Sequence, residues 1–350
     1  MKLFIPILFS LFLFNSYSQE SKASFTDFIK KEMDSMPEGF AISVALIKDG
    51  EVVHIGMLKE NDQLVLKDLQ DSLFEIGSIT KVFTSTLLAN EIVNKNIKEK
   101  KPVNKVFPFQ FNDKIKISYL SLANHTSGMY RLPSNLIPFI AKIPGNPYSE
   151  YTYAILDEYL KEELQLDKSE KPKYSYSNLG AGLLAYAISN SKGKKFEDLL
   201  EETIFSRYGM TNTSFNGKTS ISGIGPNEEK TGNWQFDALK GAGGLISSTA
   251  DLSRFIQAQF DSNNIELTLT RKETFTVSEN LSIGLGWHII QPNTKEQMYW
   301  HNGGTGGFTS STVFKTSSKI GVIVLSNISP SHSKGELIDK LCFELLNLLD

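Results

Sequence analysis

Ser78-Ile79-Thr80-Lys81-Val82-Phe83 begins the segment that decides the fold. From Ser78 to about Asn94, apolar residues occupy nearly every face of the expected helix, which indicates a buried helix rather than a surface one. Ser78 and Lys81 are three positions apart, so one helix face presents both side chains. If the serine lies at the helix start, its backbone N–H has no intrahelical acceptor and lies at the positive end of the helix dipole.

This spacing suits nucleophilic chemistry. A serine hydroxyl keeps its proton at neutral pH, so a nearby base must remove it during attack. The Lys81 amine would lie beside that hydroxyl, and the unpaired N–H of Ser78 could stabilise a developing oxyanion. The alternative is a helix-capping serine followed by a surface lysine.

Strand-like segments gather near the two chain ends, and helical segments lie between them. Ala41 to Ile47 and Val52 to Met57 are joined through Asp49-Gly50, a dipeptide typical of hairpin turns. Further strands are expected at 297–301, 309–314 and 320–325, and helices at 118–123, 149–164, 179–191, 196–204 and 335–349.

This order predicts an α/β (α+β) fold class: an antiparallel sheet flanked by helices and built from both chain ends, with a mainly helical domain inserted. We expect one domain over residues 25–349. Its sheet subdomain would comprise 25–77 plus about 240–349, and its helical subdomain about 82–239. Ser78 would then lie at the seam between the two.

Composition excludes several classes of protein. The chain has 350 residues, of which 40% are hydrophobic and 21% charged, and its formal net charge is −3. This near-neutral balance gives no electrostatic reason to expect nucleic acid as a partner. Cys342 is the only cysteine, so an intramolecular disulfide and a cysteine-rich metal site are excluded. The five histidines show no metal-binding spacing, and we expect neither a metal nor a cofactor.

The first 18 residues are typical of a secretory signal peptide. Lys2 supplies the positive start, Leu3 to Phe14 is apolar, and Ser16-Tyr17-Ser18 fits a small-x-small cleavage site. An uncleaved anchor is the alternative, but the apolar stretch is shorter than the roughly 20 residues of a spanning helix. We therefore expect cleavage near Ser18, export to the periplasm or the medium, and no stable membrane anchor.

Two later motifs extend the serine–lysine pair. Residues 74–81, Tyr176-Ser177-Asn178 and His301-Asn302-Gly303 together resemble the three ordered motifs of the class C β-lactamase and penicillin-recognising serine hydrolase superfamily. The resemblance covers roughly Phe25 to Leu349. It is supported by family-like stretches at 124–128, 243–248, 284–287 and 303–308. A lone Ser-x-x-Lys is common, whereas three motifs in this order are specific to the superfamily.

The resemblance implies a role for each matched residue. Ser78 would be the nucleophile that becomes acylated, and Lys81 and Tyr176 would share the proton transfers. Asn178 would hold Lys81 and the substrate amide, and the Gly304 N–H would complete an oxyanion hole with that of Ser78. Alternatively, Tyr176 and Asn178 are turn residues before a helix, since asparagine is a good N-cap.

The choice between the two bases stays open. Free lysine and tyrosine titrate near ~10.4 and ~10, so neither is a useful base at pH 7 unless its pKa is lowered. Burial lowers the pKa of a lysine, and an adjacent ammonium lowers that of a tyrosine. We expect Lys81 and Tyr176 to titrate as a unit.

His301 departs from the pattern of the family, which most often has lysine there. That lysine favours substrates that carry a carboxylate, whereas a histidine, with a reference pKa of ~6.5, is largely neutral at pH 7. His301, Gly303 and Thr305 are expected to bind substrate, although His301 could instead be a core residue at a strand end. The departure argues against strong β-lactamase activity more than against acyl transfer.

The resemblance therefore implies an exported serine hydrolase that acts on amide or ester bonds of a small-molecule or peptide substrate. The expected substrates are β-lactams or cell-wall peptides with D-amino acids, and small esters are an alternative. A penicillin-binding sensor that acylates without turnover is a second class, and a structural homologue with a degenerate site is a third.

Overall fold

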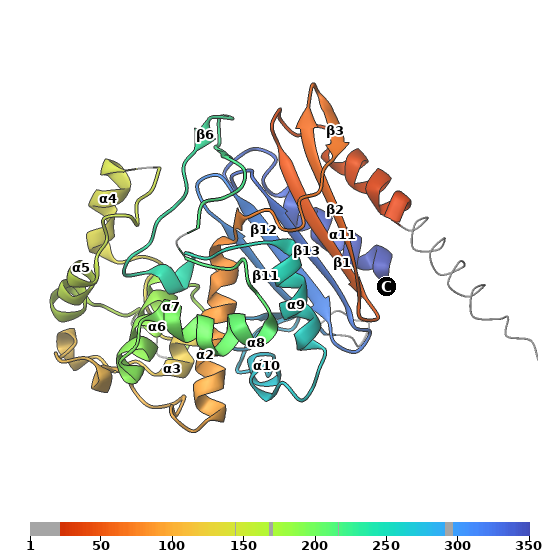
Figure 1. The fold of residues 1–350 in the computed structure, drawn as a ribbon. Coiled ribbons are helices and arrows are strands. Elements are labelled where there is room, and N and C mark those ends of the chain that lie inside the picture. Colours follow the sequence, from red (N-terminus) through yellow and green to blue (C-terminus); the bar gives the residue numbers. More distant parts are fainter. Residues whose placement is uncertain (1–21, 144, 168–170, 216, 291–296) are drawn as a thin grey trace, which may run out of the picture.

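The computed structural model describes residues 22–143, 145–167, 171–215, 217–290 and 297–350. Its centre is a nine-stranded antiparallel sheet in the order β3-β2-β1-β13-β12-β11-β10-β9-β8 (Figure 1). The strands are β1 Ala41–Lys48, β2 Glu51–Glu60, β3 Gln63–Leu66, β8 Phe275–Ser278, β9 Leu281–Ile283, β10 His288–Ile290, β11 Met298–Gly304, β12 Thr309–Lys315 and β13 Ile320–Ser326. The first strand of the chain pairs with the last, so the sheet is built from both chain ends, as predicted.

Helices cover both faces of this sheet. One helix spans residues 22–33. The others are α2 Thr80–Val93, α3 Tyr119–Ala123, α4 Ile137–Lys142, α5 Tyr153–Glu158, α6 Asn178–Lys192, α7 Phe196–Leu200, α8 Ser206–Tyr208, α9 Thr249–Gln259, α10 Ile265–Thr270 and α11 Leu337–Leu349. Two small strand pairs complete the fold: β4 Phe74–Glu75 with β7 Ile246–Ser247, and β5 Gly223–Ile224 with β6 Lys230–Thr231. Among the described helices, none is both long and apolar enough to cross a bilayer.

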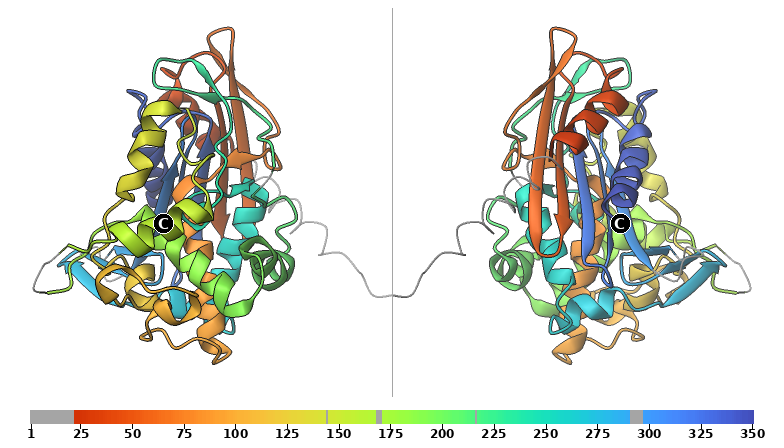
Figure 2. Two further views of the ribbon diagram at one scale, coloured as in Figure 1. Left: turned by 90° about the vertical axis from the view of Figure 1, so that its left-hand side faces the viewer. Right: turned by 90° about the vertical axis from the view of Figure 1, so that its right-hand side faces the viewer.

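The hydrophobic core has two parts, one on each face of the sheet, and successive side chains of β1 point alternately into the two. Ile42, Val44 and Leu46 face one side of the sheet, where they pack with residues of the helix at 22–33 and of α11. Figure 2 shows these two helices side by side on that face. Ala45 and Ile47 point the other way, into the larger core that contains α2 and α9. An antiparallel strand with both faces buried loses the polar alternation of a surface strand, and β1 has that apolar character.

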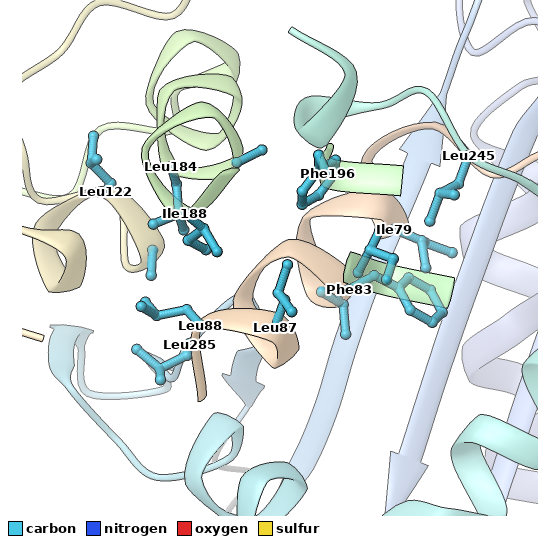
Figure 3. Close-up of a cluster of buried hydrophobic side chains, with 14 of the residues drawn as sticks. Ile79, Phe83, Leu87, Leu88, Leu122, Leu184, Ile188, Phe196, Leu245 and Leu285 are labelled. Carbon is cyan, nitrogen blue, oxygen red and sulfur yellow. The ribbon is translucent and has the colours of Figure 1, made fainter. Parts of the chain in front are cut away.

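Helix α2 lies inside the larger core. Figure 3 shows Ile79, Phe83, Leu87 and Leu88 packed against side chains from α3, α6, α7 and the loops that precede β7 and β10. Apolar groups on all sides of α2 explain why its sequence lacks a polar face. The predicted start of this helix was wrong by two residues: Ser78 lies in a 3₁₀ turn over Gly77–Ile79, and α2 begins at Thr80. The side chains of Ser78 and Lys81 still lie on the same side of the joined turn and helix.

Candidate active site

Ser78 and Lys81 meet where the 3₁₀ turn joins α2. Lys81 Nζ lies 2.8 Å from Ser78 Oγ and donates to the carbonyl oxygen of Ala242 at 2.6 Å. The Lys81 side chain is only 2% exposed. The amine is thus fixed against the hydroxyl, with a backbone carbonyl from a distant loop on its other side.

Burial sets the protonation of Lys81. Loss of hydration lowers the pKa of the Lys81 amine well below its ordinary value, and the positive charge of Arg131 lowers it further. A neutral amine has a lone pair, which can accept the Ser78 proton while one N–H still donates to Ala242. The structure therefore supplies a base at hydrogen-bonding distance from the predicted nucleophile.

Tyr176 is the third member of the cluster. Its hydroxyl shares a hydrogen bond with the Ser78 side chain, and Lys81 Nζ lies 4.8 Å from the centroid of its ring. Burial raises the pKa of Tyr176, although the Ser78 hydrogen bond and the charge of Arg131 oppose this change. The expectation that a neighbouring ammonium lowers the pKa of Tyr176 was wrong, because desolvation outweighs the nearby charge. Tyr176 therefore keeps its proton at neutral pH, and Lys81 is the better acceptor.

Glycines bring the two expected oxyanion donors together. Gly77 has φ +48°, and a Cβ on it would lie 2.6 Å from the Gly304 nitrogen. A Cβ on Gly303 would lie 2.1 Å from the Ile76 oxygen and 2.7 Å from the Ser78 nitrogen. Only residues without side chains allow β11 to approach the 3₁₀ turn this closely. The N–H groups of Ser78 and Gly304 consequently lie on adjoining backbone segments at one end of the cleft.

Asn178 lies in the cleft but does not hold Lys81. Its amide nitrogen donates to the Tyr148 hydroxyl at 3.2 Å, and the carbonyl of Ala242 takes the position expected of Asn178 beside the amine. The cap of α6 is Ser177, whose hydroxyl accepts the Gly180 N–H at 2.8 Å. Asn178 Oδ1 is buried and has no hydrogen-bond partner among the described residues.

His301 corrects the expectation of a direct substrate contact. It lies on the inward face of β11, is 1% exposed, and is absent from the lining of the cleft. Its ring lies 6.3 Å from that of Tyr176 and 5.3 Å from that of His288. Burial lowers the pKa of His301 well below its ordinary value, so the ring is neutral. The alternation of β11 therefore places His301 behind Tyr176.

His125 supports Tyr176 from another side. Its ring lies 4.6 Å from that of Tyr176 in a tilted arrangement, and its Nδ1 accepts the Ser177 N–H at 3.2 Å. Burial lowers the pKa of His125 well below its usual range as well. Within the described ranges, no three histidine, cysteine or acidic side chains form a group that could hold a metal ion.

The cluster opens into a cleft of about 1060 Å³. Ser78, Tyr176, Asn178, Gly303, Gly304 and Thr305 all line it, so every predicted site residue except Lys81 and His301 borders this space. Thr305 is 4% exposed, and its side chain lies beside the Glu75 carboxyl group.

Sequence reasoning missed several residues of the cleft, namely Arg131, Tyr148, Tyr174, Trp234 and His288. Tyr174 and His288 meet through a 2.8 Å hydrogen bond, and Tyr148 packs at 5.3 Å from Trp234. These residues come from loops and strand ends, where no periodicity marks them. Only the proximity of Tyr174 to the Tyr176 motif, and of Arg131 to residues 124–128, could have drawn attention to them.

Comparison with known proteins shows the family of this chain. The family model described as Beta-lactamase matches residues 27–345. A Beta-lactamase of Pseudomonas fluorescens is 25% identical over 336 residues, covering 82% of this chain and 88% of the relative. The D-alanyl-D-alanine-carboxypeptidase/endopeptidase AmpH of Escherichia coli (strain K12) is 24% identical over 298 residues, covering 74% and 72%.

A solved structure shows the same fold. The crystal structure of a beta-lactamase/D-alanine carboxypeptidase from Pseudomonas syringae matches with a TM-score of 0.75 at 20% identity, covering 93% of this chain and 99% of the other. The match of the family model over most of the chain identifies this protein as a serine hydrolase that belongs to the Beta-lactamase family.

Proposed function

We propose that the protein hydrolyses amide or ester bonds through an acyl-Ser78 intermediate. One observation carries this proposal: a buried lysine amine, with its pKa held well below the usual range, lies 2.8 Å from the Ser78 hydroxyl. No carboxylate among the described residues pairs with Lys81, and a buried lysine of this kind is costly to keep for structure alone. This cost argues against a degenerate site.

The geometry suggests the order of proton transfers. Ser78 Oγ attacks the substrate carbonyl carbon while its proton passes to Lys81, and the N–H groups of Ser78 and Gly304 stabilise the oxyanion. Lys81 then returns the proton, directly or through the Tyr176 hydroxyl, to the leaving nitrogen or oxygen, and the acyl-enzyme forms. Attack by water, with its proton taken by the same pair, releases the acid and restores Ser78.

The substrates we propose are β-lactams or cell-wall peptides with D-amino acids. Support comes from the relatives, which are named as beta-lactamases and as a D-alanyl-D-alanine carboxypeptidase/endopeptidase. The neutral, buried His301 favours a second candidate, a hydrolase of small esters, because the cationic contact expected of a lysine is missing there. A sensor that acylates once is the remaining alternative.

One experiment separates these functions. Purified protein and Ser78→Ala are incubated with a β-lactam, a p-nitrophenyl ester and a D-Ala-D-Ala peptide, and intact mass is followed over time. Turnover of any substrate with a transient acyl adduct supports the hydrolase, and a permanent adduct supports the sensor. Equal adducts on Ser78→Ala, or none on the wild type with all three compounds, would refute the acyl-Ser78 mechanism.

We also propose that the protein is exported. The support is the sequence pattern of residues 1–18, which lie outside the described residues. Cell fractionation followed by N-terminal sequencing tests this: a mature chain that starts near Gln19 in an exported fraction is expected, and an intact Met1 on cytoplasmic protein would contradict it.

A further inference from the structure

We propose that Arg131 binds a carboxylate group of the substrate and thereby selects anionic amides or esters. The proposal deepens the proposed hydrolase function and depends on it. It assigns the recognition of substrate charge to the loop between α3 and α4, which lines the cleft together with Tyr176.

Arg131 is held firmly at the site by its backbone. Its carbonyl oxygen accepts the N–H groups of Asn178 and Leu179 at 3.0 and 3.1 Å, so it is joined to the first turn of α6. The Arg131 guanidinium carbon lies 5.2 Å from the centroid of the Tyr176 ring. The side chain is exposed, and it lines the cleft that contains Ser78. A ligand bound to Ser78 would therefore meet this cation.

The guanidinium is available for a ligand. No carboxylate among the described residues lies within 4.0 Å of it, whereas Arg207 and Arg254 each form such an ion pair, with Glu266 and Asp251. Guanidinium groups match carboxylates through two parallel hydrogen bonds, which makes arginine suited to this recognition. An unpaired arginine in a cleft beside a nucleophile is what a site for an anionic substrate requires.

The other charged residues of the cleft restrict where an anion can bind. Glu229, Glu336 and Asp339 line the cleft as well, and among its described lining residues Arg131 is the one lysine or arginine. Like charges repel, so a carboxylate is disfavoured beside these acids. His301 offers no positive charge, because it is buried and neutral. Arg131 is thus the cation with which a substrate carboxylate can pair.

Arg131 also acts on the bases of the site, and this second effect must be separated from binding. Its positive charge contributes to the lowered pKa of Lys81. Loss of that charge would change proton transfer for every substrate alike. Loss of a carboxylate contact would affect only substrates that carry a carboxylate.

The test uses two matched pairs of esters. The first is mono-4-nitrophenyl glutarate and its methyl ester, with the carboxylate on the acyl side. The second is 4-acetoxybenzoate and its methyl ester, with the carboxylate on the leaving group. We measure kcat/KM for the wild type, Arg131→Gln, Arg131→Lys and the control Lys142→Gln. Lys142 is an exposed cation of α4 that pairs with Glu150 and does not line the cleft, so its loss changes net charge equally.

Arg131→Gln is expected to lower kcat/KM for the anionic member of at least one pair by about 10- to 100-fold more than for the neutral member, the usual scale for a charged hydrogen bond. Arg131→Lys should recover part of this preference, and Lys142→Gln should leave it unchanged. An equal loss on all four esters, or no loss, would overturn the proposal while the hydrolase function stands. Absence of both hydrolysis and Ser78 labelling in the wild type would instead reject the hydrolase function, and the proposal with it.

Discussion

Gly303→Ala tests whether close approach of β11 to the 3₁₀ turn creates the oxyanion hole. The new Cβ would lie 2.1 Å from the Ile76 oxygen and 2.7 Å from both Ser310 Oγ and the Ser78 nitrogen. Two of these atoms belong to the backbone of the turn, which cannot swing away as a side chain can. Strand and turn must separate by about 1 Å, and a displacement of that size in an active site costs about 10²-fold in rate.

The expected result is a loss of at least about 10²-fold in kcat/KM for a p-nitrophenyl ester, with overpacking that lowers the free energy of unfolding by about 1–3 kcal/mol. Gly232→Ala is the matched control, because a Cβ there has nothing within 4 Å and its φ is not in the left-handed region. Urea unfolding and steady-state kinetics are measured on both variants. If Gly303→Ala keeps the rate and stability of Gly232→Ala, the proposed oxyanion geometry is wrong.

Tyr176→Phe removes the hydrogen bond to Ser78 but keeps the ring contact with His125, so acylation should slow by about 10²-fold at unchanged stability; a near-normal acylation rate would show that the phenol takes no part. His301→Lys puts an ammonium in a site that is 1% exposed, where the described titratable groups that act on residue 301 are His288, Lys81 and His125 and no carboxylate, so it should lower the unfolding midpoint rather than favour anionic substrates; a higher nitrocefin-to-ester turnover ratio at normal stability would show that residue 301 reaches the cleft. Burial lowers the pKa of His125 and His301 well below 6.5 and that of His288 to about 4. Below about pH 6.5 the unfolded chain therefore binds more protons than the folded chain does. The free energy of unfolding should consequently fall between pH 6.5 and 4, by up to about 1.4 kcal/mol per pH unit for each of these histidines. In urea unfolding, His288→Gln should make the free energy of unfolding depend less steeply on pH. The same slope as in the wild type would contradict the assignment of this pH dependence to buried histidines.

The fold and the central pair could be predicted because their signals are local. Asp49-Gly50 predicts the first hairpin, and the continuous apolar pattern after Ser78 predicts a buried helix. The structure confirms both, with β1 and β2 joined at that turn and α2 inside the core. The family-like order of the three motifs predicts that Ser78, Lys81 and Tyr176 share one site, and the three side chains do meet there.

What the sequence did not indicate depends on contacts between distant segments. The short strands β8, β9 and β10 were missed, because three or four residues give too little alternation to recognise. The burial of His301 follows from the register of β11, and the raised pKa of Tyr176 follows from the neighbours that exclude water. Ala242 replaces Asn178 beside Lys81 through a backbone carbonyl, and a carbonyl carries no sequence signal.

The central claim is that a neutral Lys81 takes the Ser78 proton. The pH dependence of Ser78 labelling by a fluorophosphonate tests it most directly, with Lys81→Met as the comparison. We predict that the wild-type rate rises with pH and reaches its plateau well below pH 10, because burial lowers the pKa of Lys81, and that Lys81→Met is slow and lacks this rise. A wild-type rate that still increases through pH 10, or the same profile in Lys81→Met, would contradict the account.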